Sequence, residues 1–231
     1  MRTVLLHGFT GGRESFAHLG LDALTPELPG HGDAADATGW SDALDALAPL
    51  LEPGPVVLAG YSMGARLALG LALRHPDRVA RLVLESGTAG IADAAAREAR
   101  RVEDEGQARF LEEHGIAAFV DRWEDHPTLA SLQPFRARLR AQRLRHRASG
   151  LASALRRLGT GAMPPLWGEL PILSLPVTLL AGGADARFSA EARRMQALLP
   201  RAELRILEGC GHAPHLQRPE EFSRAISGGA S

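Results

Sequence analysis

Short apolar runs recur along the chain, and stretches with helical spacing separate several of them. The runs occupy residues 3–6, 24–28, 56–59, 81–85, 177–181 and 204–207. Brief apolar runs bounded by turn residues are typical of buried strands. Because strands alternate with helical segments such as 40–48 and 65–73, the pattern predicts βαβ units, hence a mostly parallel sheet flanked by helices in an α/β fold. Pro26 has no backbone donor, so its run is expected at or near a sheet edge.

The stretch from residue 94 to 170 departs from this alternation. It contains no convincing strand, and Arg, Ala, Leu and Glu recur in it at helical spacing. A helical insertion between two strands of an α/β sheet is best interpreted as a cap over the active-site edge. The sequence therefore predicts an α/β core formed by residues 1–93 and 171–231, with a helical cap at 94–170.

A glycine-flanked serine lies between one predicted strand and the helix that follows it. The segment Gly60-Tyr61-Ser62-Met63-Gly64 fits the G-x-S-x-G pattern, which marks a nucleophile elbow when a strand precedes it and a helix follows. The flanking glycines allow the close backbone approach that such a turn needs. The pattern alone is common by chance, and its strand–turn–helix context makes it a strong signal.

Bulk properties narrow the classes of partner. The chain has 231 residues, 45% of them hydrophobic, and a formal net charge of −1, so neither nucleic acid nor an anionic membrane is expected as a partner. No apolar run approaches the length of a membrane helix, and no signal peptide is expected ahead of the first strand. Cys210 is the single cysteine, which suits a reducing cytoplasm. A monomer or a small homo-oligomer is expected.

Two further side chains complete a candidate charge relay. A serine hydroxyl needs an imidazole and a carboxylate to act as base or nucleophile, and α/β-hydrolases supply them in the chain order Ser, Asp, His. Asp185 follows the run at 177–181 and His212 follows the run at 204–207. Strand ends gather at one edge of a parallel sheet, so Ser62, Asp185 and His212 are expected to converge.

Three alternatives accompany this assignment. His215 competes with His212 and Glu208 competes with Asp185, and Asp185 could simply cap the helix that begins near Ser189. His212 is preferred because the small residues before it let its loop reach the elbow. Cys210 is expected to be a packed thiol rather than a nucleophile.

The same geometry predicts an oxyanion hole. One donor is the backbone N–H of Met63, directly after the serine, and the other is the N–H of Phe9 in the turn after the first strand. Arg66 lies one helical turn beyond Ser62, where a guanidinium can reach a substrate carboxylate. Cap arginines, among them Arg100 and Arg145, are further candidates, although most cap arginines are expected to face solvent.

The chain resembles a known family over nearly its whole length. The strings Leu6-His7-Gly8-Phe9-Thr10-Gly11, Leu28-Pro29-Gly30-His31-Gly32 and the elbow through Arg66 are similar to those of 2-succinyl-6-hydroxy-2,4-cyclohexadiene-1-carboxylate synthases of menaquinone biosynthesis. The cap contains matching segments around 119–123, 129–132, 150–152 and 159–167. One departure is Ala65, which stands where the elbow usually has a glycine.

The resemblance implies an α/β-hydrolase fold and a set of roles. Ser62, Asp185 and His212 would form the triad, Arg66, Arg100 and Arg145 would bind carboxylates, and Tyr61 and Trp123 would line the pocket. Arg97 and Arg101 are close alternatives to Arg100.

The implied reaction is a lyase reaction. The enzyme would eliminate pyruvate from a succinyl-enolpyruvyl-hydroxy-cyclohexene-carboxylate, a small anionic substrate, with Ser62 acting as the base. The alternative is an esterase, lactonase or carbon–carbon hydrolase that uses the same triad. No cofactor and no metal site are expected, since the histidines are scattered.

Overall fold

A five-stranded parallel sheet forms the centre of the molecule in the computed structural model, which describes residues 1–228. Its spatial order is the chain order β1-β2-β3-β4-β5. The strands are β1 (Thr3–Leu6), β2 (Val56–Tyr61), β3 (Val79–Glu85), β4 (Val177–Gly182) and β5 (Ala202–Leu207). They are rich in Val, Leu and Ala and are buried through most of the sheet, as parallel strands covered on both faces must be. The predicted α/β class and parallel sheet are confirmed.

The predicted strand at 24–28 is wrong. Only Leu24 pairs with the sheet, in an isolated parallel bridge to Val4. Its N–H donates to the Thr3 carbonyl and its carbonyl accepts from Leu5, both at 2.9 Å. The pairing stops there because Pro26 has no donor for a ladder bond, although the segment does lie at the β1 edge as expected.

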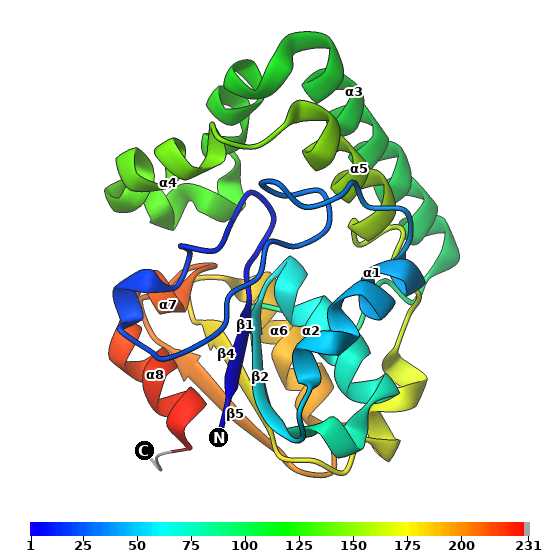
Figure 1. The fold of residues 1–231 in the computed structure, drawn as a ribbon, viewed down its shortest axis with the longest axis vertical. Helices are drawn as coiled ribbons and strands as arrows, with labels where there is room; N and C mark the ends of the chain where they lie inside the picture. Colours follow the sequence, from blue (N-terminus) through cyan, green and yellow to red (C-terminus); the bar gives the residue numbers. More distant parts are fainter. Residues whose placement is uncertain (229–231) are drawn as a thin grey trace.

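Helices cover the two faces of the sheet (Figure 1). On one face pack α1 (Trp40–Leu47), α2 (Met63–Arg74) and α6 (Ala186–Gln196), whose apolar side chains join strand residues in the larger core. On the other face α8 (Pro219–Ser227) buries Phe222 against Leu5 and Val83, with Phe16 beside it. The short α7 (Pro214–Gln217) precedes α8.

The predicted cap region forms a helical layer over the carboxyl ends of the strands (Figure 1). It contains α3 (Ala94–Glu124), α4 (Arg136–Arg143) and α5 (Ala148–Leu158), and a 3₁₀ segment at Pro127–Phe135. The α3 helix is interrupted at Gly115, whose φ of 78° lies in the left-handed region. Leu111 and Phe119 of α3 pack on Leu151 and Leu155 of α5 in a small core of their own. The exact division at 93/94 and 170/171 stays a prediction.

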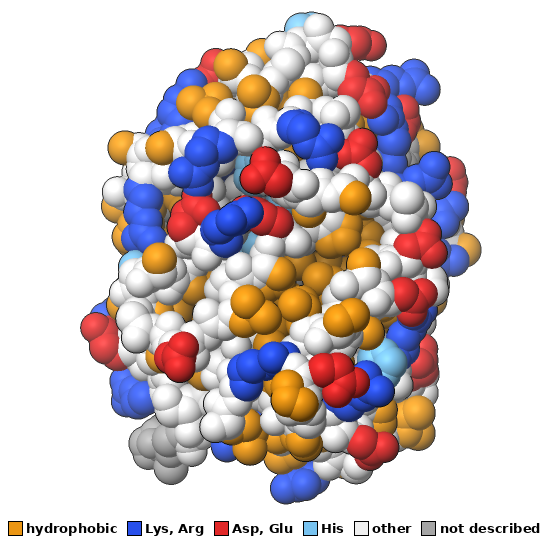
Figure 2. Space-filling model, in the orientation of Figure 1, with side chains coloured by type: hydrophobic (Ala, Val, Ile, Leu, Met, Phe, Trp, Pro, Cys, Tyr) orange, Lys and Arg blue, Asp and Glu red, His pale blue; other side chains and the backbone are white. Residues whose placement is uncertain are grey.

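The surface of the face shown in Figure 2 is mixed in charge. Over the cap, basic and acidic side chains lie next to one another, and hydrophobic side chains gather lower down. Several cap arginines form ion pairs, such as Arg156 with Glu105 at 2.7 Å and Arg109 with Glu105 at 2.8 Å. Exposed pairs of this kind contribute little to stability.

Candidate active site

Ser62 lies in the sharp turn between β2 and α2. Its φ of 53° and ψ of −107° are rare for a residue with a side chain, and such strain is typical of a nucleophile elbow. The two glycines of the motif are sterically required. A Cβ on Gly64 would lie 2.0 Å from the Leu6 carbonyl oxygen, and one on Gly60 would lie 2.3 Å from the carbonyl oxygen of Gly64. Glycine at these two positions therefore allows the strand, turn and helix to approach this closely.

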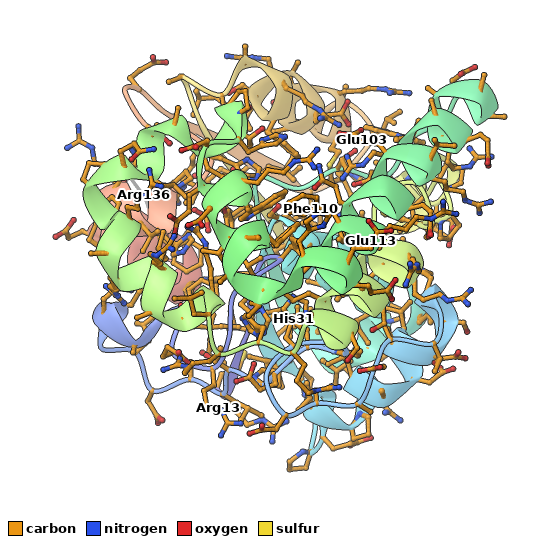
Figure 3. The ribbon with its side chains drawn as sticks, turned by 90° about the horizontal axis from the view of Figure 1, so that it is seen from above. Arg13, His31, Glu103, Phe110, Glu113 and Arg136 are labelled. Carbon is orange, nitrogen blue, oxygen red and sulfur yellow. The ribbon has the colours of Figure 1, made fainter. Side chains whose placement is uncertain are left out.

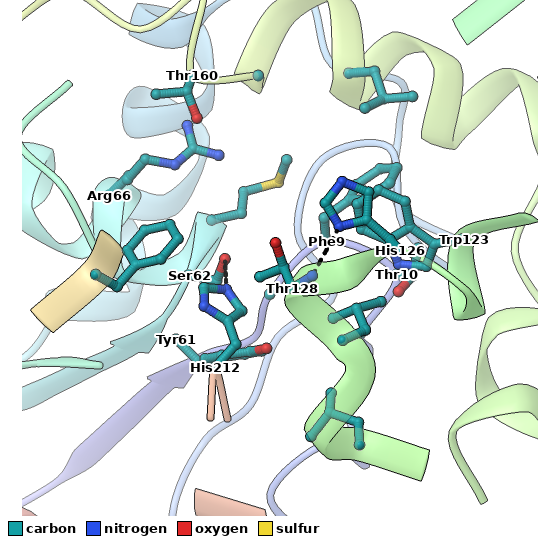
Figure 4. A pocket seen from close by; sticks show the side chains of 18 of the residues that line it. Phe9, Thr10, Tyr61, Ser62, Arg66, Trp123, His126, Thr128, Thr160 and His212 are labelled. Carbon is teal, nitrogen blue, oxygen red and sulfur yellow. Dashed lines mark hydrogen bonds between the residues drawn. The ribbon is translucent and has the colours of Figure 1, made fainter. Parts of the chain in front are cut away.

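The elbow serine meets the two side chains that the sequence analysis paired with it. The Oγ of Ser62 lies 3.0 Å from Nε2 of His212, and Nδ1 of His212 lies 2.7 Å from Oδ2 of Asp185 (Figure 4 shows the Ser62–His212 contact). A carboxylate only accepts hydrogen bonds, so Nδ1 carries the proton and Nε2 is left to accept from the serine hydroxyl. This is the geometry in which a serine proton can move to an imidazole.

Asp185 has two partners. Burial alone would raise the pKa of its carboxyl, but the hydrogen bond and the charge of His212, with the Phe188 N–H, outweigh it and lower that pKa. The Phe188 N–H donates to Oδ1 at 3.2 Å, so Asp185 is also the N-cap of α6, which begins at Ala186 rather than near Ser189. The helix-capping alternative and the His-pairing role are therefore both true of this residue.

The competing residues of the sequence analysis have other partners, although His215 also lines the cavity. Nδ1 of His215 is 2.9 Å from Oε2 of the buried Glu85 at the end of β3, and it holds no contact to Ser62 among those of the described residues. Glu208 is exposed, and its carboxylate lies near Gly183. Cys210 is a buried free thiol whose pKa is raised by that burial, which makes the thiolate scarce.

Met63 and Phe9, whose backbone N–H groups are the predicted oxyanion donors, lie close to the serine. Met63 is the first residue of α2, so its N–H has no partner within the helix. The loop after β1 approaches from the other side: a Cβ on Gly8 would lie 2.7 Å from the Tyr61 ring and 3.5 Å from Cβ of Ser62. Phe9 follows directly, and Met63 and Phe9 both line the cavity above Ser62. Their role as oxyanion donors stays a prediction.

A cavity of about 200 Å³ lies between the elbow and the cap. One side is polar, with Arg66 and Thr160, and the other carries the rings of Phe9, Trp123 and His126 (Figure 4). Trp123 packs edge-on against Phe9 at 5.3 Å between ring centroids. The Tyr61 ring lies 5.4 Å from that of His212. Tyr61 and Trp123 are thus at the cavity wall, and their part in substrate binding stays a prediction.

Arg66 is a buried cation at the polar end of this cavity. Its Nη1 donates to the carbonyl oxygen of Leu158 at 2.7 Å, which fixes the guanidinium and leaves its other N–H groups for a ligand. Burial, reinforced by the nearby Arg100 charge, lowers the pKa of Arg66 to about 10. The side chain is therefore charged at neutral pH, and an anion would relieve its desolvation.

Arg100, rather than Arg97 or Arg101, lines the cavity. Its Nε donates to Oδ1 of Asp104 at 2.8 Å. Asp104 is buried, its Oδ2 has no hydrogen-bond partner, and burial raises the pKa of its carboxyl. Arg97 instead donates to the Ile91 carbonyl and Arg101 to that of Gly161. Of the three arginines that the sequence analysis left open, Arg100 is therefore the one that faces the cavity.

Arg145 lies outside the cavity, and its part in binding a carboxylate stays a prediction. Its side chain is 63% exposed and pairs with Glu14, and it is absent from the cavity lining within residues 1–228. Arg143 takes its place: it is 5% exposed, lines the cavity, and donates to Oε1 of the buried Glu124 at 3.2 Å. Arg145 lies beyond the end of α4, so the loop turns it outward.

A signal for Arg143 was present in the sequence. Arg136, Arg140 and Arg143 recur at helical spacing and share one face of α4. All three donate to the carboxylate of Glu124, the first two at 2.8 and 3.0 Å. In this chain the shared face places the three arginines around one buried acid. Asp104 was missed for a different reason, since nothing in its local pattern separates it from the other acidic residues of α3.

Neither a metal-binding cluster nor a membrane-spanning helix is present among the described residues. Residues 1–228 contain no group of three or more His, Cys, Asp or Glu side chains arranged to hold a metal ion. In the same part of the chain no helix is long and apolar enough to cross a membrane.

The model of the alpha/beta hydrolase family matches residues 3–225. The chain belongs to the alpha/beta hydrolase family. This alpha/beta hydrolase is 35% identical to a Bacillus subtilis (strain 168) protein provisionally named 2-succinyl-6-hydroxy-2,4-cyclohexadiene-1-carboxylate synthase, over 97% of this chain and 88% of the other. It is 33% identical to the synthase of that name from Klebsiella pneumoniae subsp. pneumoniae, over 94% and 88%.

A solved structure of a similar protein has the same fold. The alpha/beta hydrolase superimposes on MenH from S. aureus with a TM-score of 0.92 and 31% identity, over 98% of this chain and 92% of that one. The predicted fold and the predicted family resemblance are confirmed.

Proposed function

We propose that this alpha/beta hydrolase is a lyase that eliminates pyruvate from a succinyl-enolpyruvyl-hydroxy-cyclohexene-carboxylate, giving 2-succinyl-6-hydroxy-2,4-cyclohexadiene-1-carboxylate in menaquinone biosynthesis. The observation that carries the proposal is the arginine set around Ser62. Arg66, Arg100 and Arg143 line one cavity with the serine, and a substrate with several carboxylates matches them. The names of the relatives support the same reaction.

The proposed chemistry is an elimination that begins with proton abstraction by Ser62. His212, oriented by Asp185, takes the hydroxyl proton of Ser62 as the serine oxygen removes a proton from a ring carbon. The ring carbon–carbon double bond forms as the carbon–oxygen bond to the enolpyruvyl group breaks. The departing enolate takes a proton from His212 and becomes pyruvate. The N–H groups of Met63 and Phe9 stabilise the charge that develops on a substrate carboxylate.

Ser62→Ala tests the proposed base. The variant should lose pyruvate release almost completely while its affinity for the substrate stays nearly unchanged, because the arginines and the cavity remain. Isothermal titration and a pyruvate-coupled assay measure the two quantities. Activity retained in this variant would sink the proposal.

A serine hydrolase that works through an acyl-enzyme is the second candidate, and the Ser62–His212–Asp185 geometry favours it equally. The arginines separate the two, since the pocket of a generic esterase is mostly apolar. A p-nitrophenyl ester screen beside the pyruvate assay ranks them.

The setting of the reaction is part of the proposal. We infer a cytoplasmic enzyme that works on a small anionic substrate with no nucleic-acid or membrane partner, as a monomer or a small homo-oligomer. The net charge of −1 and the single cysteine support this view. Light scattering on the purified protein measures the oligomeric state.

A further inference from the structure

Three buried histidines form a cluster that the proposed chemistry does not use. His7 follows β1, His31 lies in the loop after the Leu24 bridge, and His146 comes from the cap, between α4 and α5. Their rings are in edge contact, with centroids 5.0 Å apart for His7 and His31 and 5.5 Å apart for His31 and His146. Seen from above, His31 lies near the middle of the molecule, beneath the cap (Figure 3). Buried imidazoles need hydrogen-bond partners, and the partners of these three rings indicate what the rings do.

Each ring bridges a backbone N–H and a backbone carbonyl. Nε2 of His7 accepts from the Leu28 N–H at 3.2 Å, and its Nδ1–H donates to the Gly8 carbonyl oxygen at 2.9 Å. His7 thus fixes the orientation of Gly8 and joins its loop to the next one. The residue after Gly8 is Phe9, a proposed oxyanion donor.

The other two rings hold a single residue between them. Nε2 of His31 accepts from the Thr10 N–H at 3.3 Å, and Nε2–H of His146 donates to the Thr10 carbonyl oxygen at 3.1 Å. Thr10 has a φ of 65°, which is unfavourable for a β-branched residue and persists only where the surroundings enforce it. The two imidazoles supply that enforcement, one from the core and one from the cap.

The remaining nitrogens anchor the rings. Nδ1–H of His31 donates to the Pro29 carbonyl oxygen at 3.2 Å, and Nδ1 of His146 accepts from the Gly32 N–H at 2.9 Å. Every ring in the cluster therefore donates once and accepts once. Only a neutral imidazole has both capacities, because a protonated ring has two donors and no acceptor.

Burial keeps the rings neutral. It lowers the pKa of His7 to about 4 and that of His31 well below its usual value, and it also lowers that of His146. The charged neighbours act in opposite directions. Glu27, whose Oε2 is 3.7 Å from Nε2 of His7, favours protonation, and Arg145 near His146 opposes it.

We propose that His7, His31 and His146 are positioning residues that hold the oxyanion loop, residues 8–11, in its working conformation, with His146 coupling the cap to that loop. The inference rests on the proposed function only in taking the Phe9 N–H as an oxyanion donor. The cap would then do more than cover the substrate, since it supplies one of the two hydrogen bonds that fix Thr10.

The first test separates the two nitrogens of His146. In His146→Gln the side-chain amide reaches the ε position and can still donate to Thr10, whereas His146→Asn reaches only the δ position and His146→Leu does neither. A displaced oxyanion donor affects the transition state more than substrate binding. We expect kcat to fall about tenfold or more in the Asn and Leu variants, with KM changed less than about twofold, and the Gln variant to recover most of the loss.

A matched control removes a different cap-to-core hydrogen bond. The Ala37 N–H donates to Oγ of Ser153, on α5, at 2.9 Å, and this bond does not involve residues 8–11. Ser153→Ala should leave kcat near the wild-type value. Equal kcat losses in Ser153→Ala and His146→Leu, or no loss in His146→Asn and His146→Leu, would overturn the proposal. The same series run on a p-nitrophenyl ester keeps this test independent of whether pyruvate is the product.

Long-range ¹H–¹⁵N NMR of the wild-type histidine rings gives a readout without turnover. The proposal requires the Nδ1–H tautomer for His7 and His31 and the Nε2–H tautomer for His146, all neutral at pH 6. A protonated ring or an opposite tautomer at His31 or His146 contradicts it, whatever reaction the enzyme performs.

Discussion

Asp185 and His212 are joined by a hydrogen bond of 2.7 Å, and the same carboxylate caps the helix that follows it. Oδ2 accepts from His212 while Oδ1 accepts from the Phe188 N–H. With both oxygens engaged, the carboxylate cannot rotate, and the imidazole is held in one orientation toward Ser62. The helix start and the proposed relay are therefore a single structural unit.

Asp185→Asn separates the two tasks of this residue. The amide oxygen can still cap α6, but the amide no longer holds His212 in the tautomer that accepts from Ser62. For Asp185→Asn we expect kcat to fall by about 10³- to 10⁴-fold, with little change in thermal stability because the cap of α6 is kept. Asp185→Ala should show a similar kcat loss and also lose about 1 kcal/mol of stability. Near-wild-type turnover in the Asn variant would rule out the relay.

Arg143 and Arg145 form a matched pair, because they lie two residues apart and face opposite ways. Arg143→Gln removes a cavity-lining charge, so kcat/KM should fall about 10- to 100-fold. A loss of this size corresponds to one charge-assisted hydrogen bond to the substrate. Arg145→Gln should change kcat/KM less than about twofold, because its partner is the surface residue Glu14. Steady-state pyruvate release measures both. A larger loss for Arg145→Gln would show that the substrate-bound enzyme turns this side chain inward.

The elbow glycine Gly64 has no room for a methyl group. Gly64→Ala would place a Cβ 2.0 Å from the Leu6 carbonyl oxygen, so the backbone must shift and the variant should lose about 3 kcal/mol or more of stability. Gly106, inside α3, has nothing within 4 Å of such a Cβ. Gly106→Ala should gain up to about 1 kcal/mol, since alanine is the better helix former. Urea unfolding of the two variants gives both values, and equal stabilities would show that the elbow relaxes freely.

Acid should destabilise the fold through the buried His7. Burial lowers the pKa of His7 from its ordinary 6.5 to about 4, so between these values the unfolded chain binds more protons than the folded one. The free energy of unfolding therefore rises with pH in this window. The contribution of neutral His7 is complete above about pH 6.5 and is lost as pH falls toward 4.

This contribution can be measured by urea unfolding at pH 7 and pH 5. For His7 alone, the lowered pKa would amount to a loss of about 2 kcal/mol over that interval. His7→Gln removes the titrating group, so the variant should lose correspondingly less stability than the wild type on the same acidification. An identical loss in the two proteins would show that His7 does not titrate in this range.

The sequence predicted the parallel sheet and the elbow because both depend on local rules. Apolar runs and glycines are constrained by the strand and turn that contain them, and Ser62 is placed by its immediate neighbours. The end of each late strand likewise placed Asp185 and His212 at one sheet edge. The run at 24–28 was mistaken for a strand because its length and apolarity matched one, while a single proline decided the outcome.

The cap was less predictable, because its functional contacts are long-range. Arg143 is directed inward by Glu124, which is 19 residues away in the sequence. The clamp on Thr10 joins a core loop to His146, 136 residues further on. Helical spacing groups arginines on one face of α4 but does not identify their partner, so sequence reasoning could point to this segment and still select Arg145, which lies outside the cavity.

The most direct test of the central claim is the product formed by the purified wild-type protein from the succinyl-enolpyruvyl-hydroxy-cyclohexene-carboxylate. Pyruvate is followed by a coupled dehydrogenase assay and the ring diene by its ultraviolet absorbance, beside a p-nitrophenyl ester control. The account predicts pyruvate and diene in equal amounts, with kcat/KM far above that for the ester. Strong ester turnover with no pyruvate would contradict it.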